Sequence, residues 1–103
     1  DRVTAYLNLF VRTFPTAEQV SRAFGIPERT FRGQLSKENR PFQGLVDQVK
    51  ADKARRYLAD SGRSVAEIAE LLGYSESAAF VRAFERWTGK TPARHRKEAR
   101  DGQ

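Results

Sequence analysis

The sequence predicts an all-α fold in which one long helix joins two similar helix-turn-helix subdomains. From Phe42 to Asp60 the apolar residues fall mostly at three- and four-residue intervals, and neither glycine nor proline interrupts the stretch after Gly44. The segments before and after it carry the same pattern of helix-starting and helix-ending residues. At about 1.5 Å per residue, this helix would span roughly 28 Å.

Size and composition limit what the chain can be. With 103 residues, it forms one compact unit or two very small ones that share a connecting helix. Hydrophobic residues at 39% and charged residues at 31% are typical of a soluble helical domain. No apolar run approaches the roughly 18 residues of a membrane span and no secretory signal opens the sequence, so we expect a cytoplasmic protein. The lack of cysteine excludes disulfides and thiolate chemistry.

The chain is strongly basic. Its 19 Lys and Arg residues against 13 Asp and Glu give a formal net charge of +6 and a pI near 10.2. An anionic partner such as nucleic acid fits this charge, and a merely well-solvated surface fits it too.

The first helix is expected to start at Asp1, which can cap it, and to end at Pro15. One face of it should be buried, through apolar residues at helical spacing, namely Val3, Tyr6, Leu7, Phe10 and Phe14.

A helix, a tight turn and a second helix follow. Thr16 and Gln19 have the spacing of a capping box, which starts a helix through about Phe24. Gly25 suits the left-handed end of that helix, and Pro27 can take the first position of the next. This next helix, from Glu28 to about Glu38, turns Phe31 and Leu35 inward.

The same arrangement returns after the long helix. Ser64 and Glu67 form a second capping box, and Gly73 ends the helix that they start. The buried side of that helix should consist of Val65, Ile68, Ala69 and Leu72.

Two more helices complete the chain. Ser75 can cap a helix that ends at Gly89 and packs through an aromatic stripe of Phe80, Phe84 and Trp87. We interpret the stripe as core rather than as base-stacking groups. Thr91, followed by a proline, starts a last basic helix from Ala93 to about Ala99, and residues 100–103 should be frayed.

The two halves match position by position. Thr16 and Ser64 lie 48 positions apart, as do Gly25 and Gly73, whereas Phe31 and Phe80 lie 49 apart. The second copy therefore holds one extra turn residue. In a helix-turn-helix the second helix projects and can enter the major groove of DNA, which is about 12 Å wide. A helical bundle with no nucleic-acid role is the competing interpretation.

Two segments resemble a known family. Ser64 to Arg96 contains the elements IA..LGY, F.R.F.R..G and TP, and closely resembles the C-terminal signature of AraC/XylS-type transcription regulators. EQVSRAFGIPERTFRGQLSKE, followed by PFQGLV, resembles that family's other half, so the similarity covers about Thr16 to Arg96.

This resemblance implies seven helices, divided into a subdomain of residues 1–41, a linker helix of 42–60 and a subdomain of 61–103. It also implies site-specific binding to promoter DNA and transcription control through contact with RNA polymerase, more often activation than repression. Members usually carry an N-terminal domain that binds an effector or dimerises. We therefore expect this chain to be an isolated DNA-binding portion or a minimal member, with no small-molecule ligand or cofactor of its own.

The geometry of the motif places base readers in the first turns of each projecting helix. In the first copy these are Glu28, Arg29, Arg32 and Gly33. An arginine fork can bond O6 and N7 of guanine, which is worth about 1 to 3 kcal/mol of discrimination. Glu28 can accept from cytosine N4 or merely favour the helix dipole. Gly33 departs from the family pattern, so it either permits close backbone approach or marks a copy that reads few bases.

The matching positions of the second copy are Ser77, Ala78, Val81 and Arg82. Only Arg82 offers a strong donor fork, whereas Ala78 and Val81 can touch thymine methyl groups. A structural role for Arg82 is the alternative. The second copy should therefore make fewer directional contacts than the first.

Phosphate contacts are expected where helices begin, because free backbone amides there favour anions. The positions are Thr16, Ala17, Ser64, Val65 and Thr91, with Arg86, Lys90, Arg94 and Arg96 as side-chain partners. A solvated surface is the alternative for each basic residue taken singly.

The sequence lacks the residues that other functional classes, such as enzymes and metal-binding proteins, require. No nucleophile with a base, phosphate loop or metal cluster is found, so we expect no enzyme. His95, the single histidine, has no partner for a metal site. Lys50 replaces an arginine that is common in the family. A helical protein-interaction or RNA-binding module stays open as the alternative function.

Overall fold

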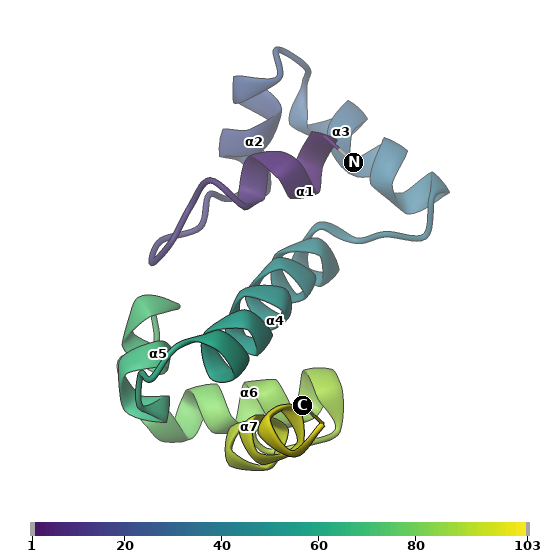
Figure 1. The fold of residues 1–103 in the computed structure, drawn as a ribbon. Helices are drawn as coiled ribbons and strands as arrows, with labels where there is room; N and C mark the ends of the chain where they lie inside the picture. Colours follow the sequence, from purple (N-terminus) through teal and green to yellow (C-terminus); the bar gives the residue numbers. More distant parts are fainter. Residues whose placement is uncertain (1, 103) are drawn as a thin grey trace. The chain divides into compact units, whose positions relative to one another are not determined.

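Seven helices and no strand make up residues 2–102, the part of the chain that this computed structural model describes (Figure 1). The predicted all-α class is confirmed. In chain order the helices are α1 (Arg2–Leu7), α2 (Ala17–Ala23), α3 (Glu28–Lys37), α4 (Phe42–Asp60), α5 (Val65–Leu71), α6 (Ser77–Thr88) and α7 (Pro92–Asp101).

The chain divides within α4 into two compact units, one up to Val49 and one from Lys50 onward. Each has its own apolar core. The first gathers buried residues of α1 to α4, which are Leu7, Ala17, Val20, Phe31, Leu35, Leu45, Val46 and Val49. The second gathers Ala54, Leu58, Ile68, Ala69, Leu72, Phe80 and Phe84.

Both helix-turn-helix motifs are built by the same local bonds. The Thr16 hydroxyl accepts from the amide of Gln19 at 3.2 Å, while the Gln19 side chain accepts from the amide of Thr16 at 2.9 Å. Ser64 and Glu67 repeat this pair of bonds at 3.1 and 2.9 Å. Both predicted capping boxes are therefore confirmed.

The turns after α2 and α5 also share one geometry. Gly25 and Gly73 adopt left-handed φ values of 73° and 90°. The amide of the residue after each glycine reaches back five positions, from Ile26 to Ser21 at 3.0 Å and from Tyr74 to Ala69 at 2.9 Å. This is a Schellman ending in both copies. The second turn is one residue longer, as predicted, because α3 begins at Glu28 and α6 at Ser77.

The first helix is much shorter than predicted. α1 ends at Leu7: the amide of Asn8 still makes the helical bond to the carbonyl of Thr4 at 3.0 Å, but the next two amides make only tight three-residue bonds. The Asn8 side chain donates to the same carbonyl at 2.9 Å. The chain then runs without helix to Pro15, which disfavours helical backbone at the residue before it. Leu9 is 75% exposed in this segment. The predicted cap at Asp1 lies outside the described residues.

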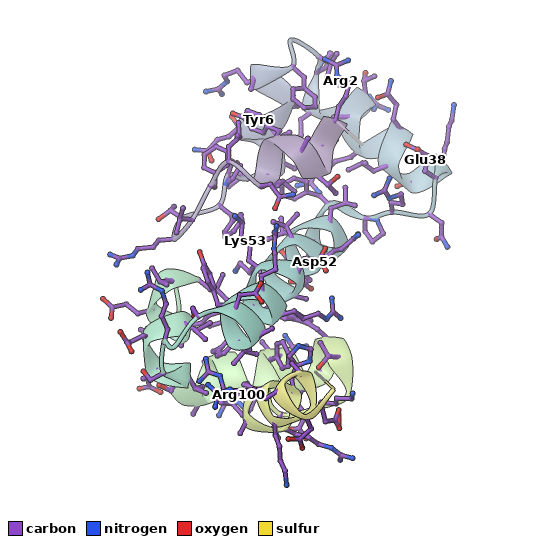
Figure 2. All side chains as sticks on the ribbon, in the orientation of Figure 1. Arg2, Tyr6, Glu38, Asp52, Lys53 and Arg100 are labelled. Carbon is purple, nitrogen blue, oxygen red and sulfur yellow. The ribbon has the colours of Figure 1, made fainter. Side chains whose placement is uncertain are left out.

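Three other helix ends differ from the predictions. Pro27 caps α3 from outside instead of taking its first position. α6 begins at Ser77 after Glu76, so Ser75 is not its cap, because the longer turn shifts the start. α7 continues to Asp101, and Arg100 extends from it as part of the helix (Figure 2). The frayed end predicted for residues 100 and 101 is therefore wrong. The helix ends before Gly102, which has a right-handed φ of −79°.

The long helix and the aromatic stripe agree with the prediction. α4 runs from Phe42 to Asp60. Phe80 and Phe84 are fully buried, and Trp87 packs against the same core. Thr91 caps α7 by accepting from the amide of Arg94 at 3.2 Å, with proline at the first helical position.

Candidate nucleic-acid interface

α3 turns one face into the first core and the other to solvent. Phe31 and Leu35, one helical turn apart, are only 2% and 5% exposed. This burial fixes the rotation of the helix about its axis and leaves Arg29, Arg32 and Gly33 exposed. The outer face of α3 can therefore contact another molecule without any change in the core.

The two arginines of this face differ in their surroundings. Arg32 donates through Nε to a carboxylate oxygen of Glu28 at 2.7 Å, one turn earlier. Arg29 makes no hydrogen bond or ion pair within residues 2–102. Glu28 is half-buried and has a role that the sequence did not suggest, because it orients the fork of Arg32.

α6 has the same division of faces. Phe80, Ala83 and Phe84 are buried, so the opposite side of the helix is open. At its start Ser77, Ala78 and Arg82 are exposed, whereas Val81 is half-buried. Arg82 has no hydrogen-bond or ion-pair partner in the described chain. It is therefore the strongest donor in the first turns of this helix that is free to contact a ligand.

The capping boxes reduce the number of free amides at the starts of α2 and α5. The amides of Thr16 and Ser64 are taken by Gln19 and Glu67, as are the two hydroxyl groups. The first helical residues are Ala17 and Val65, and a helix offers no internal acceptor for their amides. Ala17 is only 2% exposed as a whole residue, so its amide is hardly accessible to a ligand, and the phosphate contact predicted for it is not supported.

Several basic side chains lie where α6 ends and α7 begins. Arg86 is exposed in the last turn of α6. Lys90 and Arg94, on either side of Thr91, both bond the carboxylate of Glu98. The residues predicted as phosphate contacts at this place are thus brought together, except one.

That exception is Arg96. Its Nε donates to the carbonyl of Leu58 at 2.9 Å, and its Nη2 donates to the carbonyls of Ser61 and Arg63. The guanidinium is half-buried and ties α7 to the chain between α4 and α5. Its Nε and Nη2 donors are already used inside the protein.

Glu98 was missed by sequence reasoning. Its spacing from Arg94 was a visible signal, since side chains four apart on a helix meet. The bond between Glu98 and Lys90 joins residues eight positions apart, so no short-range sequence pattern predicts it. Hydrogen bonds from Lys90 and, next, from Arg94 lower the pKa of Glu98, so that the carboxylate stays ionised at neutral pH.

Two further positions singled out in the sequence have packing roles. The ring of His95 lies edge-on to Phe84, with 5.6 Å between centroids. Burial lowers the pKa of His95, and the charges of Arg55 and Lys90 lower it further. The Lys50 ammonium lies 5.1 Å from the centre of the Tyr74 ring, which is a cation–π distance.

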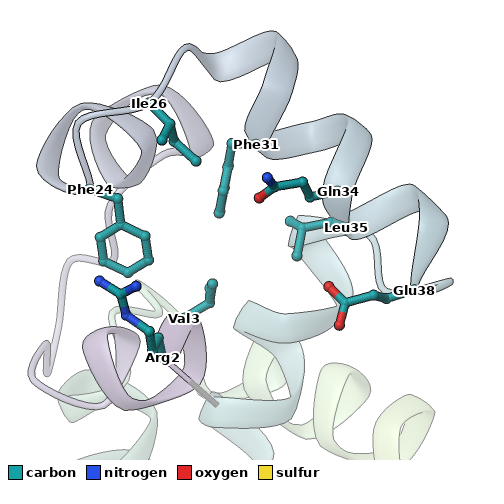
Figure 3. A pocket seen from close by; sticks show the side chains of 8 residues that line it. All are labelled: Arg2, Val3, Phe24, Ile26, Phe31, Gln34, Leu35 and Glu38. Atoms are coloured by element: carbon teal, nitrogen blue, oxygen red, sulfur yellow. The ribbon is translucent and has the colours of Figure 1, made fainter.

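A hollow of about 430 Å³ opens between α1 and α3, and neither Arg29 nor Arg32 lines it (Figure 3). The Arg2 guanidinium lies over the Phe24 ring at one side, 5.3 Å from its centroid. The lining is formed by Arg2, Val3, Phe24, Ile26, Phe31, Gln34, Leu35 and Glu38. Elsewhere in residues 2–102, no three metal-ligating side chains come together, and none of the helices could cross a lipid bilayer.

Comparison with known proteins points to one family. A family model described as a helix-turn-helix domain matches residues 20–98. The ornithine utilization regulator of Pseudomonas aeruginosa is 39% identical over 83 residues, which cover 81% of this chain and 24% of that protein. The chain spans about a quarter of the length of the curated relatives that it matches.

Solved structures share the fold. The DNA-binding transcriptional dual regulator of Escherichia coli K-12 superposes with a TM-score of 0.89 at 18% identity, covering 97% of this chain and 90% of that one. An AraC-type DNA-binding domain-containing protein of Chromobacterium violaceum gives a TM-score of 0.88 at 13% identity, covering 94% and 88%. With the family match and the relatives above 30% identity, these findings show that the chain belongs to the AraC/XylS-type helix-turn-helix transcription regulators, as their DNA-binding domain.

Proposed function

We propose that this domain reads an asymmetric site on duplex DNA by placing α3 and α6 in successive major grooves, and that it regulates transcription from that site. One observation carries the proposal. The chain builds the same capped helix, Schellman turn and projecting helix twice, and each projecting helix keeps its polar face open. A binding module that grips a partner by other means has no need of two such helices.

The base contacts divide unequally between the two helices. We assign Arg29 and Arg32 to guanine, with Glu28 orienting Arg32, and Gly33 to a point where the backbone comes near the base edges. In α6 we assign Arg82 to a guanine contact, while Ser77, Ala78 and Val81 give weaker polar or apolar contacts. α3 then supplies most of the sequence discrimination.

Phosphate contacts would position both helices. We assign them to the amide of Val65 and to the side chains of Arg86, Lys90 and Arg94, and we leave out the buried Ala17. Thr16, Ser64 and Thr91 contribute by holding the helix starts in place. We leave Arg96 out of the interface because its donors already bond carbonyl groups of the protein.

The regulatory context is also part of the proposal. Activation through contact with RNA polymerase is the expected outcome of binding, and it takes place in the cytoplasm. An effector or dimerisation domain would come from the rest of a longer protein, as in relatives about four times the length of the match. Residues 1–41 and 61–103 would act as the two reading subdomains, with 42–60 joining them. The domain binds and does not catalyse.

Selection of bound duplexes from a randomised DNA pool, at near-physiological salt, tests the proposal. Two short enriched blocks about 10 base pairs apart would support one domain reading two grooves. Arg29→Ala should relax the preference at particular base pairs, whereas Lys90→Ala should weaken all sequences alike. Binding without any sequence preference would favour the alternative of a protein-interaction or RNA-binding module.

A further inference from the structure

The junction of α6 and α7 holds its basic side chains in a fixed arrangement. Gly89 has a left-handed φ of 80°, which lets the chain turn from one helix to the next. The Thr88 hydroxyl then accepts from the amide of Lys90 at 3.2 Å, and the Thr91 hydroxyl accepts from the amide of Arg94 at 3.2 Å. The backbone of both residues is therefore held at the start of α7, the positive end of its dipole.

One carboxylate serves both of them. Oε1 of Glu98 accepts from the Lys90 ammonium, and Oε2 accepts from Arg94 Nε at 3.2 Å. Because the two oxygens are used separately, the three side chains form one group with a net charge of +1. Glu98 and Lys90 are 40% and 45% exposed and Arg94 is 70% exposed, so the group can be reached from solvent.

The other proposed interface arginines of this unit lack such a partner. Arg82 and Arg86 make no ion pair within residues 2–102, so each can offer a full charge to DNA. A phosphate that approaches Lys90 and Arg94 instead meets two cations and an anion.

We propose that Glu98 limits the affinity of this domain for the DNA backbone by keeping one of the two charges of Lys90 and Arg94 neutralised. The inference rests on the proposed function and adds a residue that sets its strength. Each neutralised phosphate contributes about −0.9 to the slope of log K against log salt concentration. Glu98 therefore makes binding weaker and less salt-dependent for every sequence, without choosing among sequences.

Glu98→Gln tests this directly. Glutamine keeps an oxygen that accepts hydrogen bonds, so the variant removes the charge with little change in shape. Asp52→Asn is the matched control, since Asp52 forms a 2.8 Å ion pair with Arg55 on α4, where no residue is assigned to the interface. Both variants raise the net charge by one. Fluorescence anisotropy would measure binding to the selected duplex and to a random duplex from 50 to 200 mM salt.

Glu98→Gln should steepen the salt slope by about 0.9 for both duplexes, which is an additional loss of about threefold over that range of salt. The ratio of the two affinities should not change, and the slope of Asp52→Asn should stay at the wild-type value. An unchanged slope for Glu98→Gln would overturn the inference, as would an equal shift for both variants or weaker binding by Glu98→Gln.

Two more variants separate this inference from the function on which it rests. Lys90→Ala and Arg94→Ala should each make the salt slope shallower. If neither does, the backbone contact at α7 is wrong and the inference fails, while recognition by α3 stands as long as Arg29→Ala still relaxes base preference. If the wild-type domain prefers no sequence, the proposed function itself fails.

Discussion

Arg96 separates a structural role from a DNA contact more sharply than any other residue of this domain. Its guanidinium bonds the carbonyls of Leu58, Ser61 and Arg63, which lie 33 to 38 positions earlier in the chain. A hydrogen bond to a charged group contributes about 1.5 to 3 kcal/mol. The bond to Ser61 is at the 3.5 Å limit, and water can replace part of the others because the site is half-buried. We therefore expect Arg96→Ala to lower the free energy of unfolding by about 2 to 3 kcal/mol.

Urea unfolding followed by the fluorescence of Trp87 would measure this loss, because Trp87 is the only tryptophan and packs against the second core. Arg96→Lys should lose nearly as much, since one ammonium cannot reproduce the planar fork. Arg94→Ala is the control, because it removes the same charge from an exposed position. It should change the stability by less than about 0.5 kcal/mol.

DNA binding gives the opposite pattern. Arg94→Ala should make the salt slope of binding shallower, whereas Arg96→Ala, measured where it is still folded, should leave the slope unchanged. A stable Arg96→Ala variant with a shallower slope would refute the structural reasoning. It would restore the phosphate role that the sequence suggested.

Three other changes test the fold and its coupling to binding. A Cβ on Gly33 would meet no atom within 4 Å, so Gly33→Ala should stabilise the first unit by up to about 1 kcal/mol in urea unfolding. If the same variant loses DNA affinity, the backbone at Gly33 approaches the bases. Ser64→Ala removes the hydroxyl of the second capping box and should cost about 1 kcal/mol of stability, measured in the same way, whereas an unchanged midpoint would mean that water replaces the cap. The pKa of His95 is lowered in the folded state, so as the pH falls the unfolded chain takes up the proton before the folded protein does. The stability of the second unit should therefore be constant above pH 6.5 and decrease as the pH drops toward the folded pKa. His95→Phe should make the Trp87 unfolding midpoint less sensitive to pH between 7.5 and 5.5, and an identical pH profile in both proteins would contradict this.

Local signals explain what the sequence could predict. The information for a capping box or a left-handed helix end lies within three to five residues, so Thr16, Ser64, Gly25 and Gly73 were placed correctly. The spacing of apolar residues likewise fixed the long helix. The end of α1 depended on where four-residue backbone bonds give way to three-residue bonds, which happens after Asn8. Apolar spacing, which continued to Phe14, carries no information about that change.

The candidate site was harder to predict because the sequence does not show which groups a charged side chain bonds in the folded protein. Arg86, Lys90, Arg94 and Arg96 all belong to one basic stretch, and nothing local distinguishes them. The difference comes from groups distant along the chain, such as the carbonyl of Leu58, or across a turn, such as Glu98.

These partners change the electrostatics that the proposed interface can supply. Counted from the sequence, the four basic residues of that stretch would neutralise four phosphates. In the structure Arg96 keeps its charge but bonds carbonyls inside the protein, and Glu98 offsets one charge of Lys90 and Arg94, which leaves the equivalent of about two cations for contact with DNA phosphates. A weak backbone term gives a larger share of the binding free energy to base contacts. The unpaired Arg29 and Arg82 on the two projecting helices are then the residues on which recognition of a particular site depends most.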